Sequence, residues 1–148
     1  MAVVQIPVPE GTLLAPFARG DGMYVDAFEA PCDGAGLGEL INAFYEQPLM
    51  RAERVLLSLA GMPSAAGDVA ALAAGAATRF AAWDVEARRA DELLLADRSG
   101  HTMSWLMVGP GVVRFGSAVL QQGPVMRALL GPHKLYSRLL LSGAARRL

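Results

Sequence analysis

The chain has 148 residues, of which 53% are hydrophobic, and its thirteen basic and fourteen acidic side chains leave a net charge of −1. This length fits a single domain over 1–148, with a core large enough to fold without disulfides or metals. The near balance of charges argues against a nucleic-acid partner, because such binding needs a basic surface. No uncharged apolar stretch reaches roughly eighteen residues, so integral membrane association is not expected.

The N-terminus and the cysteine content indicate the compartment. The first residues, MAVVQIPVPEGT, lack the basic region of a signal peptide and include two prolines. Cys32 is the only cysteine, so an intrachain disulfide is impossible. Both observations favour a cytoplasmic location.

The first half of the chain combines an extended pattern with helical ones. Residues 1–22 predict a surface arm or a short edge strand, because their prolines are tolerated only at the edge of a sheet. Apolar residues at helical spacing follow, and Ser64 is a candidate N-cap. The predicted elements are strand 22–30 and helices 37–47, 49–59 and 64–74.

The second half predicts an antiparallel meander followed by a long helix. Four segments alternate apolar and polar residues, and turn sequences such as Arg98-Ser99-Gly100 separate them. Gly116 is a candidate bulge, and Gly131-Pro132 is expected to divide the helix. The predicted strands are 80–89, 92–97, 101–108 and 112–120, and the helix covers about 125–147.

The alternation assigns one apolar side of the meander to the interior. In strand 80–89 the apolar side carries Trp83, Val85 and Ala87, which leaves Asp84, Glu86 and Arg88 toward solvent. The predicted lining of the concave face comprises Trp83, Met103, Trp105, Met107 and Phe115. A ligand pocket and a filled core are equally supported by such a set.

The last helix supplies the other wall of this interior. Its predicted inward stripe contains Leu135, Tyr136, Leu139 and Leu140, and Tyr136 is the best candidate for a polar contact with a ligand. Leu140 completes the predicted ligand-binding set, together with Arg114 as a possible anchor for a carboxylate or phosphate.

Four stretches carry a family resemblance: YVDAFEA, FYEQPLMRAERVLLSLAG, WDVEARRADELLLADRSGHTMSWLMV and GPHKLYSRLLLSGAARRL. In this order they resemble the START-like helix-grip superfamily (SRPBCC), and residues from about 23 to 148 resemble its uncharacterised bacterial family labelled domain of unknown function 2867. The resemblance implies an α+β fold in which a curved antiparallel sheet of five or six strands wraps a long C-terminal helix. Two or three short helices would separate the first strand from the meander. It also implies a ligand cavity between sheet and helix, and no particular reaction.

Three functions are compatible with this sequence. The first is a container for an apolar or amphipathic small molecule. The second is an enzyme of the cyclase or hydratase kind, with His101 or His133 as base and Tyr136 or Arg114 polarising a carbonyl. The third is an interaction module, a possible homodimer, that would use Leu141 and Leu148 on the outer side of the last helix. The two histidines stand apart from any cysteine or carboxylate cluster, so neither a metal nor another cofactor is predicted.

Overall fold

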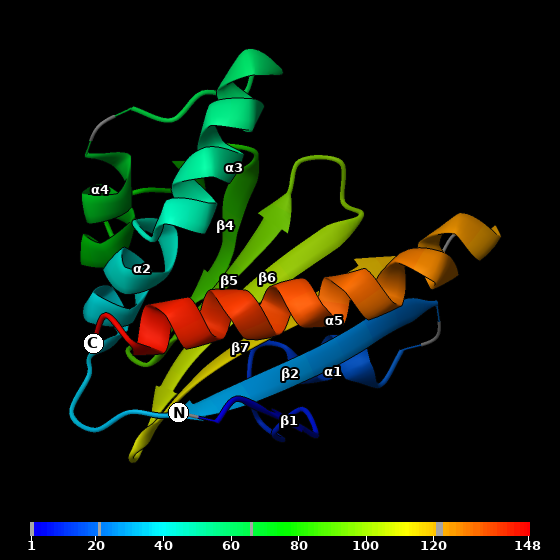
Figure 1. Cartoon of the computed structure of the whole chain (residues 1–148), viewed down its shortest axis with the longest axis horizontal. Coiled ribbons are helices and arrows are strands. Elements are labelled where there is room, and N and C mark those ends of the chain that lie inside the picture. The colour runs from blue at the N-terminus through cyan, green and yellow to red at the C-terminus, as the bar shows by residue number, and fades with distance from the viewer. Residues whose placement is uncertain (1, 21, 66, 121–122) are drawn as a thin grey trace.

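The chain folds as an α+β protein with one seven-stranded antiparallel sheet and a C-terminal helix (Figure 1). The computed structural model describes residues 2–20, 22–65, 67–120 and 123–148. Its helices are α1 (Ala15–Ala18), α2 (Leu37–Tyr45), α3 (Pro48–Leu59), α4 (Asp68–Ala74) and α5 (Gly123–Ala145). Its strands are β1 (Val4–Ile6), β2 (Met23–Pro31), β3 (Arg79–Phe80), β4 (Trp83–Arg88), β5 (Glu92–Asp97), β6 (Thr102–Gly109) and β7 (Val112–Leu120).

The strand order β1-β2-β7-β6-β5-β4-β3 places the first long strand beside the last one. The meander β3 to β7 follows the chain from one edge, and tight turns connect its strands. Gly100 and Gly111 adopt positive φ values of 77° and 72° in two of these turns, a conformation that glycine adopts without steric cost. Strand β2 then pairs with β7 over its whole length, from Met23↔Leu120 to Pro31↔Val112.

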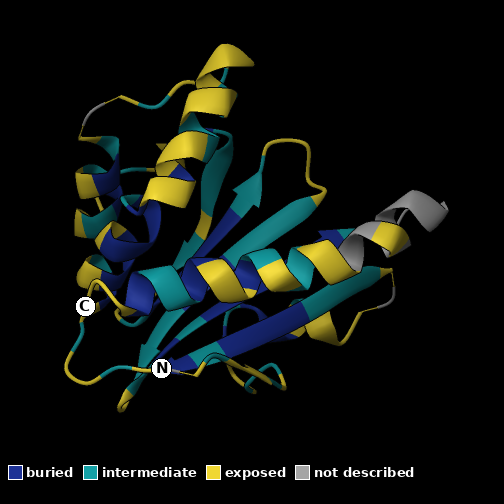
Figure 2. Ribbon diagram, in the orientation of Figure 1, coloured by how far each residue is buried: buried dark blue, intermediate teal, exposed yellow. Residues whose placement is uncertain are grey.

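The two faces of the sheet are covered differently (Figures 1 and 2). Helices α2 and α5 pack on one face, here called the inner face, and the buried side chains of this layer include Ile41, Phe44 and Leu141. The N-terminal segment covers the opposite or outer face, where Leu14 packs beside Trp105. The central strands β2, β5, β6 and β7 therefore bury residues on both sides of the sheet.

Helix α3 is the least covered of the longer helices. Pro48 occupies its first turn, where the missing N–H would be unpaired in any case. Only Met50 of this helix is buried, and Figure 2 shows α3 as mostly exposed. The apolar side chains of Val55, Leu56 and Leu59 are 61–81% exposed. No helix among the described residues is long and apolar enough to cross a membrane.

The structure confirms the meander and corrects several boundaries. The predicted strand 80–89 is two strands, because Ala81, with φ of 51°, turns the chain between β3 and β4. The predicted arm contains β1 and the short helix α1, which the sequence pattern did not show. A single helix, α5, runs through Pro132, whereas two segments were expected.

Helix α4 begins at Asp68 and not at Ser64. The carboxylate of Asp68 accepts a hydrogen bond from the N–H of Ala65 at 2.5 Å, so this side chain reaches back over the start of the helix. The hydroxyl of Ser64 is the partner of Arg54 Nε, at 3.1 Å. Ser64 therefore connects α3 to the following loop and is not a helix cap.

The bulge in the sheet lies in β4. Gly116 pairs regularly with Ala27 and Trp105, while the register of β4 on β5 shifts between Val85 and Ala87. As a result Val85 packs in the inner layer and Ala87 in the outer one. The predicted inward position of Ala87 is therefore wrong, because an extra residue in a strand reverses the faces of those that follow.

Candidate ligand-binding cavity

A cavity of about 300 Å³ lies between the inner face of the sheet and helices α2, α3 and α5. Its floor comes from β4, β6 and β7, and its walls come from the end of α2, from α3 and from α5. The volume lies at the lower end of the range for small-molecule pockets, roughly 300–1,000 Å³. The lining residues are Phe44, Tyr45, Met50, Glu53, Trp83, Thr102, Met103, Ser104, Phe115, Ser117, Val119, His133, Tyr136, Ser137 and Leu140.

Aromatic side chains form one end of the cavity. The rings of Phe44 and Phe115 lie 4.8 Å apart, and Tyr45 packs edge-on against Phe80 at 5.0 Å. Trp83 stacks on Phe80 from the neighbouring strand. Burial, and then the nearby Glu53 carboxylate, raise the pKa of Tyr45, so its hydroxyl stays protonated in the neutral range.

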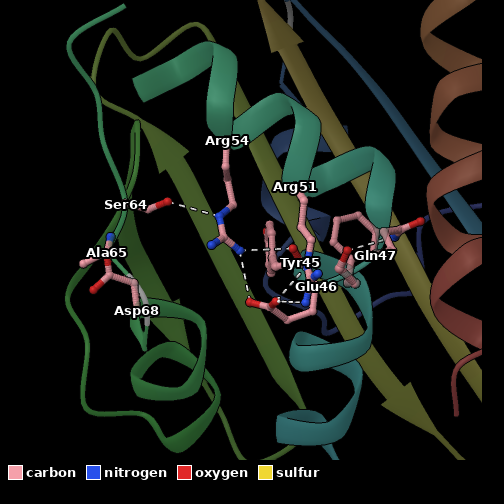
Figure 3. A network of polar contacts seen from close by, with 9 residues as sticks. Tyr45, Glu46, Gln47, Arg51, Arg54, Ser64, Ala65 and Asp68 are labelled. Carbon is pink, nitrogen blue, oxygen red and sulfur yellow. Dashed lines mark hydrogen bonds and ion pairs between the residues drawn. The ribbon is translucent and has the colours of Figure 1, made fainter. Parts of the chain in front are cut away.

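A polar network on α3 holds this aromatic end from behind (Figure 3). The guanidinium of Arg54 donates to the carbonyl oxygen of Tyr45 at 3.3 Å and to the carboxylate of Glu46 at 3.1 Å. The same guanidinium lies over the ring of Phe80, 5.6 Å from its centroid. Arg51 also binds Glu46, at 2.9 Å. Arg54 thus contacts both the backbone at the end of α2 and the Phe80 ring of β3.

The amide of Gln47 connects helix α5 to the end of α2. Gln47 is 3% exposed, and its Nε2 donates to the carbonyl oxygens of Phe44 and Leu140, both at 2.9 Å. Gly143 of α5 faces this amide, and a Cβ atom built there would lie 2.2 Å from Gln47 Oε1. The close approach of the two helices therefore depends on a glycine at this position.

Tyr136 connects α5 to α3 across the cavity. Its hydroxyl donates a hydrogen bond to the carboxylate of Glu53, and both residues line the cavity. Burial and this hydrogen bond raise the pKa of Tyr136. The predicted contact of Tyr136 with a ligand would therefore compete with a contact that the hydroxyl already makes.

Asp26 and His133 meet where α5 crosses β2. The side chain of Asp26 has no exposed area, and its Oδ2 lies 3.8 Å from His133 Nε2. Tyr24 donates its hydroxyl to the same oxygen at 3.0 Å. Burial raises the pKa of Asp26 above its ordinary value, although His133, the Tyr24 hydroxyl and Lys134 each act in the opposite direction. Asp26 was not among the predicted site residues.

Several of the predicted lining residues do meet at the cavity. The structure brings together five of them and the candidate base His133, from three strands and the last helix. They are Trp83, Met103, Phe115, His133, Tyr136 and Leu140. Met103 borders the cavity, but its side chain packs with the outer layer.

Trp105, Met107 and Arg114 lie on the outer face, so their predicted inward positions are wrong. Trp105 is completely buried beside Leu14 in the outer layer, and Met107 packs against the same layer. Arg114 pairs with the carboxylate of Glu29 at 2.8 Å, next to Met107. Strand β6 turns Thr102, Ser104 and Leu106 inward, since these pair directly with the inward residues of β7.

The inward stripe of α5 is also different from the predicted one. Leu135 and Leu139 are 61% and 50% exposed, whereas Leu141, predicted on the outer side, is fully buried. Ser137 is 1% exposed and lies in the inward stripe with Leu140 and Leu141. Leu148 is partly exposed as expected, and homodimerisation through this helix stays a prediction.

His101 lies in the exposed turn between β5 and β6 and not in the cavity. Its Nδ1 is 2.7 Å from the hydroxyl of Ser99, which in turn binds Asp97. Asp97 also accepts hydrogen bonds from the N–H and the hydroxyl of Thr102. Partial burial alone would raise the pKa of Asp97, but these hydrogen bonds outweigh it and lower the pKa to about 2. The turn is thus organised around a carboxylate, with His101 at its periphery.

We expect the Asp97→Asn variant to be less stable than the wild type at pH 7, by about 1 kcal/mol. The folded pKa of Asp97 lies below the ordinary value of 3.8, so its contribution is complete above about pH 4 and is lost as the pH falls through 2. Urea denaturation at pH 7 and at pH 2.5 should show the difference between the two proteins shrinking in acid. The exposed Glu86, replaced by glutamine, provides the control. An equal difference at both pH values would contradict this account.

The polar residues that sequence reasoning missed include Asp26, Ser137 and Glu53, as well as Ser104 and Ser117 of the cavity floor. Asp26 is the only acid on its face of β2, and an acid among otherwise uncharged residues of one face is the signal that could have identified it. Ser137 gave no signal, because a serine within a helix is usually exposed. No group of three or more His, Cys, Asp or Glu residues in the described ranges is arranged to hold a metal ion.

Comparison of the chain with family models, with curated proteins and with solved structures finds no match in any of the three.

Proposed function

We propose that this protein binds an apolar or amphipathic small molecule in the cavity between its sheet and α5, within a START-like helix-grip fold. The observation that carries the proposal is the cavity of about 300 Å³ lined by Phe44, Trp83 and Phe115. Ligand pockets are concave and mostly apolar, with a few polar groups, and this partly open cavity has that kind of lining. Its aromatic end and its few polar side chains therefore favour an apolar or amphipathic occupant.

The position of the cavity also supports binding. Glu53 of α3 and Tyr136 of α5 meet at its lining, and both helices carry exposed apolar side chains. Helix α3 has few buried residues of its own, so it is the wall that can move with least loss of packing. For a ligand to enter, α3 would have to move away from α5, but the sheet would not have to change.

The enzymatic alternative has less support from the geometry. Of the two candidate bases only His133 lines the cavity. The two groups suggested for polarising a carbonyl are otherwise engaged, since Tyr136 donates to Glu53 and Arg114 pairs with Glu29 on the outer face. Binding therefore remains the function that the site favours.

The proposal can be tested with N-phenyl-1-naphthylamine, a neutral dye whose fluorescence rises in apolar surroundings. We expect saturable binding at one site per chain and a rise in melting temperature that follows mass action. Ser104 lies on the cavity floor, so Ser104→Phe should fill the space and weaken binding at least tenfold.

A matched control is available on the same strand. Met107 faces the outer layer, so Met107→Phe introduces the same ring without reaching the cavity and should leave the affinity unchanged. Equal loss of binding in both variants, or undiminished binding in Ser104→Phe, would contradict the proposal.

A further inference from the structure

A row of polar side chains crosses the inner face of the sheet below α5. Asp26 of β2 pairs directly with Ser117 of β7, and Ser117 pairs directly with Ser104 of β6. Directly paired residues in antiparallel strands project to the same side. The next residue in the row is Leu95 of β5, so the polar character is confined to the side of the floor nearest β2.

Two polar residues of α5 lie above this row. His133 and Ser137 are four residues apart on the helix and therefore share one side of it. Both line the cavity, as Ser104 and Ser117 do. The cavity therefore has two chemically different ends: a polar one between α5 and β2, and an aromatic one at Phe44 and Trp83.

Hydrogen-bond partners are missing at the polar end. Asp26 Oδ1, His133 Nε2 and Ser137 Oγ are buried, and none has a hydrogen-bond partner among the described residues. The separation of 3.8 Å between His133 Nε2 and Asp26 Oδ2 is too long for a hydrogen bond. Buried polar atoms are nearly always paired in folded proteins, so the unpaired His133 Nε2 and Ser137 Oγ, both on residues that line the cavity, indicate a partner that arrives from the cavity.

We propose that His133 and Ser137 bind the hydroxyl group of an alcohol or phenol, whose apolar part fills the aromatic end of the cavity, and that Asp26 positions His133 for this contact. The inference rests on the proposed function and names the class of ligand that the cavity takes.

The hydrogen-bonding capacity of the two residues selects a hydroxyl group. Nε2 is the unpaired ring nitrogen of His133 and lies 3.8 Å from the Asp26 carboxylate, which favours the tautomer that carries its hydrogen on Nε2, and this N–H can be donated to a ligand oxygen. Ser137 can donate as well as accept. A ligand hydroxyl donates once and accepts once, so it satisfies His133 and Ser137 together, whereas a hydrocarbon satisfies neither.

The local charges select a neutral head group. Asp26 is the buried acid of this end, and Lys134 is a nearby cation among the described side chains, with its Nζ 5.6 Å from the centre of the Tyr24 ring. A ligand carboxylate would be repelled by Asp26, and a ligand ammonium would be repelled by Lys134 and would compete with His133 for Asp26. Each ionic head would therefore meet a like charge at this end of the cavity, so a neutral donor-acceptor group is preferred.

Isothermal titration calorimetry with naphthalene, 2-naphthol and 2-naphthoate tests the inference, because the three share one ring system. We expect 2-naphthol to bind at least tenfold more tightly than either of the others. Ser137→Ala, His133→Phe and Asp26→Asn should each reduce its preference over naphthalene to less than threefold, with little change in the affinity for naphthalene itself. Ser142→Ala is the matched control, because its hydroxyl binds Arg146 away from the cavity.

The outcomes separate the two proposals. Equal affinities for naphthalene and 2-naphthol, or a preference that survives in Ser137→Ala and His133→Phe, would overturn the hydroxyl site and leave the binding function intact. Failure of all three compounds while N-phenyl-1-naphthylamine binds would also overturn the hydroxyl site alone. Failure of that dye as well would overturn both. Ser137→Ala removes one atom, so it remains informative even if Asp26→Asn does not fold.

Discussion

Replacing Gly143 by alanine should destabilise the protein by about 2–4 kcal/mol, although alanine is the better helix former. The new Cβ atom would lie 2.2 Å from Oε1 and 3.2 Å from Cδ of Gln47, so the amide must move. Gln47 is buried, and its Nε2 bridges the carbonyl oxygens of Phe44 and Leu140. Displacing it breaks both hydrogen bonds and leaves the buried Gln47 amide unpaired, and an unpaired buried group costs about 1–3 kcal/mol.

The control for this variant lies in the same helix. No described atom lies within 4 Å of a Cβ built on Gly131, so Gly131→Ala should be neutral or stabilising by up to about 1 kcal/mol. Urea denaturation followed by circular dichroism measures the free energy of unfolding of both variants. If Gly143→Ala proved as stable as the wild type, this would show that α2 and α5 are not held at the distance that the Gln47 bridge implies. Because Leu140 and Phe44 line the cavity, the destabilised variant should also bind N-phenyl-1-naphthylamine less tightly.

The strands of the meander could be predicted because their signals are local. Alternation in β6 and β7, and glycine at the turn between them, depend on a few neighbouring residues. The choice of inner face depends on distant ones. In β6 the larger side chains, Met103 and Trp105, face outward because Leu14 of the N-terminal segment covers them. The sequence of β6 alone does not indicate that a second layer covers the outer face of the sheet.

The polar end of the cavity illustrates the same limit. The acid Asp26 belongs to the first long strand, and His133 belongs to the last helix. Only the pairing of β2 with β7, and the passage of α5 across β2, bring them within 3.8 Å. The sequence identified His133 as a candidate by its residue type alone. It could not supply the partner, because that contact follows from topology and not from spacing along the chain.

On the outer face, a buried carboxylate connects the N-terminal segment to the sheet. Glu92, at the start of β5, is 2% exposed. Its Oε1 accepts hydrogen bonds from the N–H of Leu13 at 2.8 Å and from Nε1 of Trp105 at 2.9 Å. Its Oε2 pairs with Arg89 at 3.0 Å. One carboxylate therefore accepts hydrogen bonds both from the indole N–H of Trp105 in the outer layer and from a backbone N–H of the segment that covers this layer.

We expect Glu92→Ala to destabilise the protein by about 3–5 kcal/mol, because it removes one partner of a buried charged network and leaves the Trp105 and Leu13 N–H groups unpaired. The exposed Glu86 in the neighbouring strand offers the control, and Glu86→Ala should change stability by less than about 0.5 kcal/mol. Limited proteolysis under native conditions gives a second measurement, since loss of the Leu13 contact should expose the segment before α1 to cleavage.

The cavity lies on the other face of the sheet, so the folded fraction of Glu92→Ala should retain its affinity for N-phenyl-1-naphthylamine. A variant that lost stability and affinity together would show instead that the outer layer controls the shape of the cavity floor through Trp105 and its neighbours in β6.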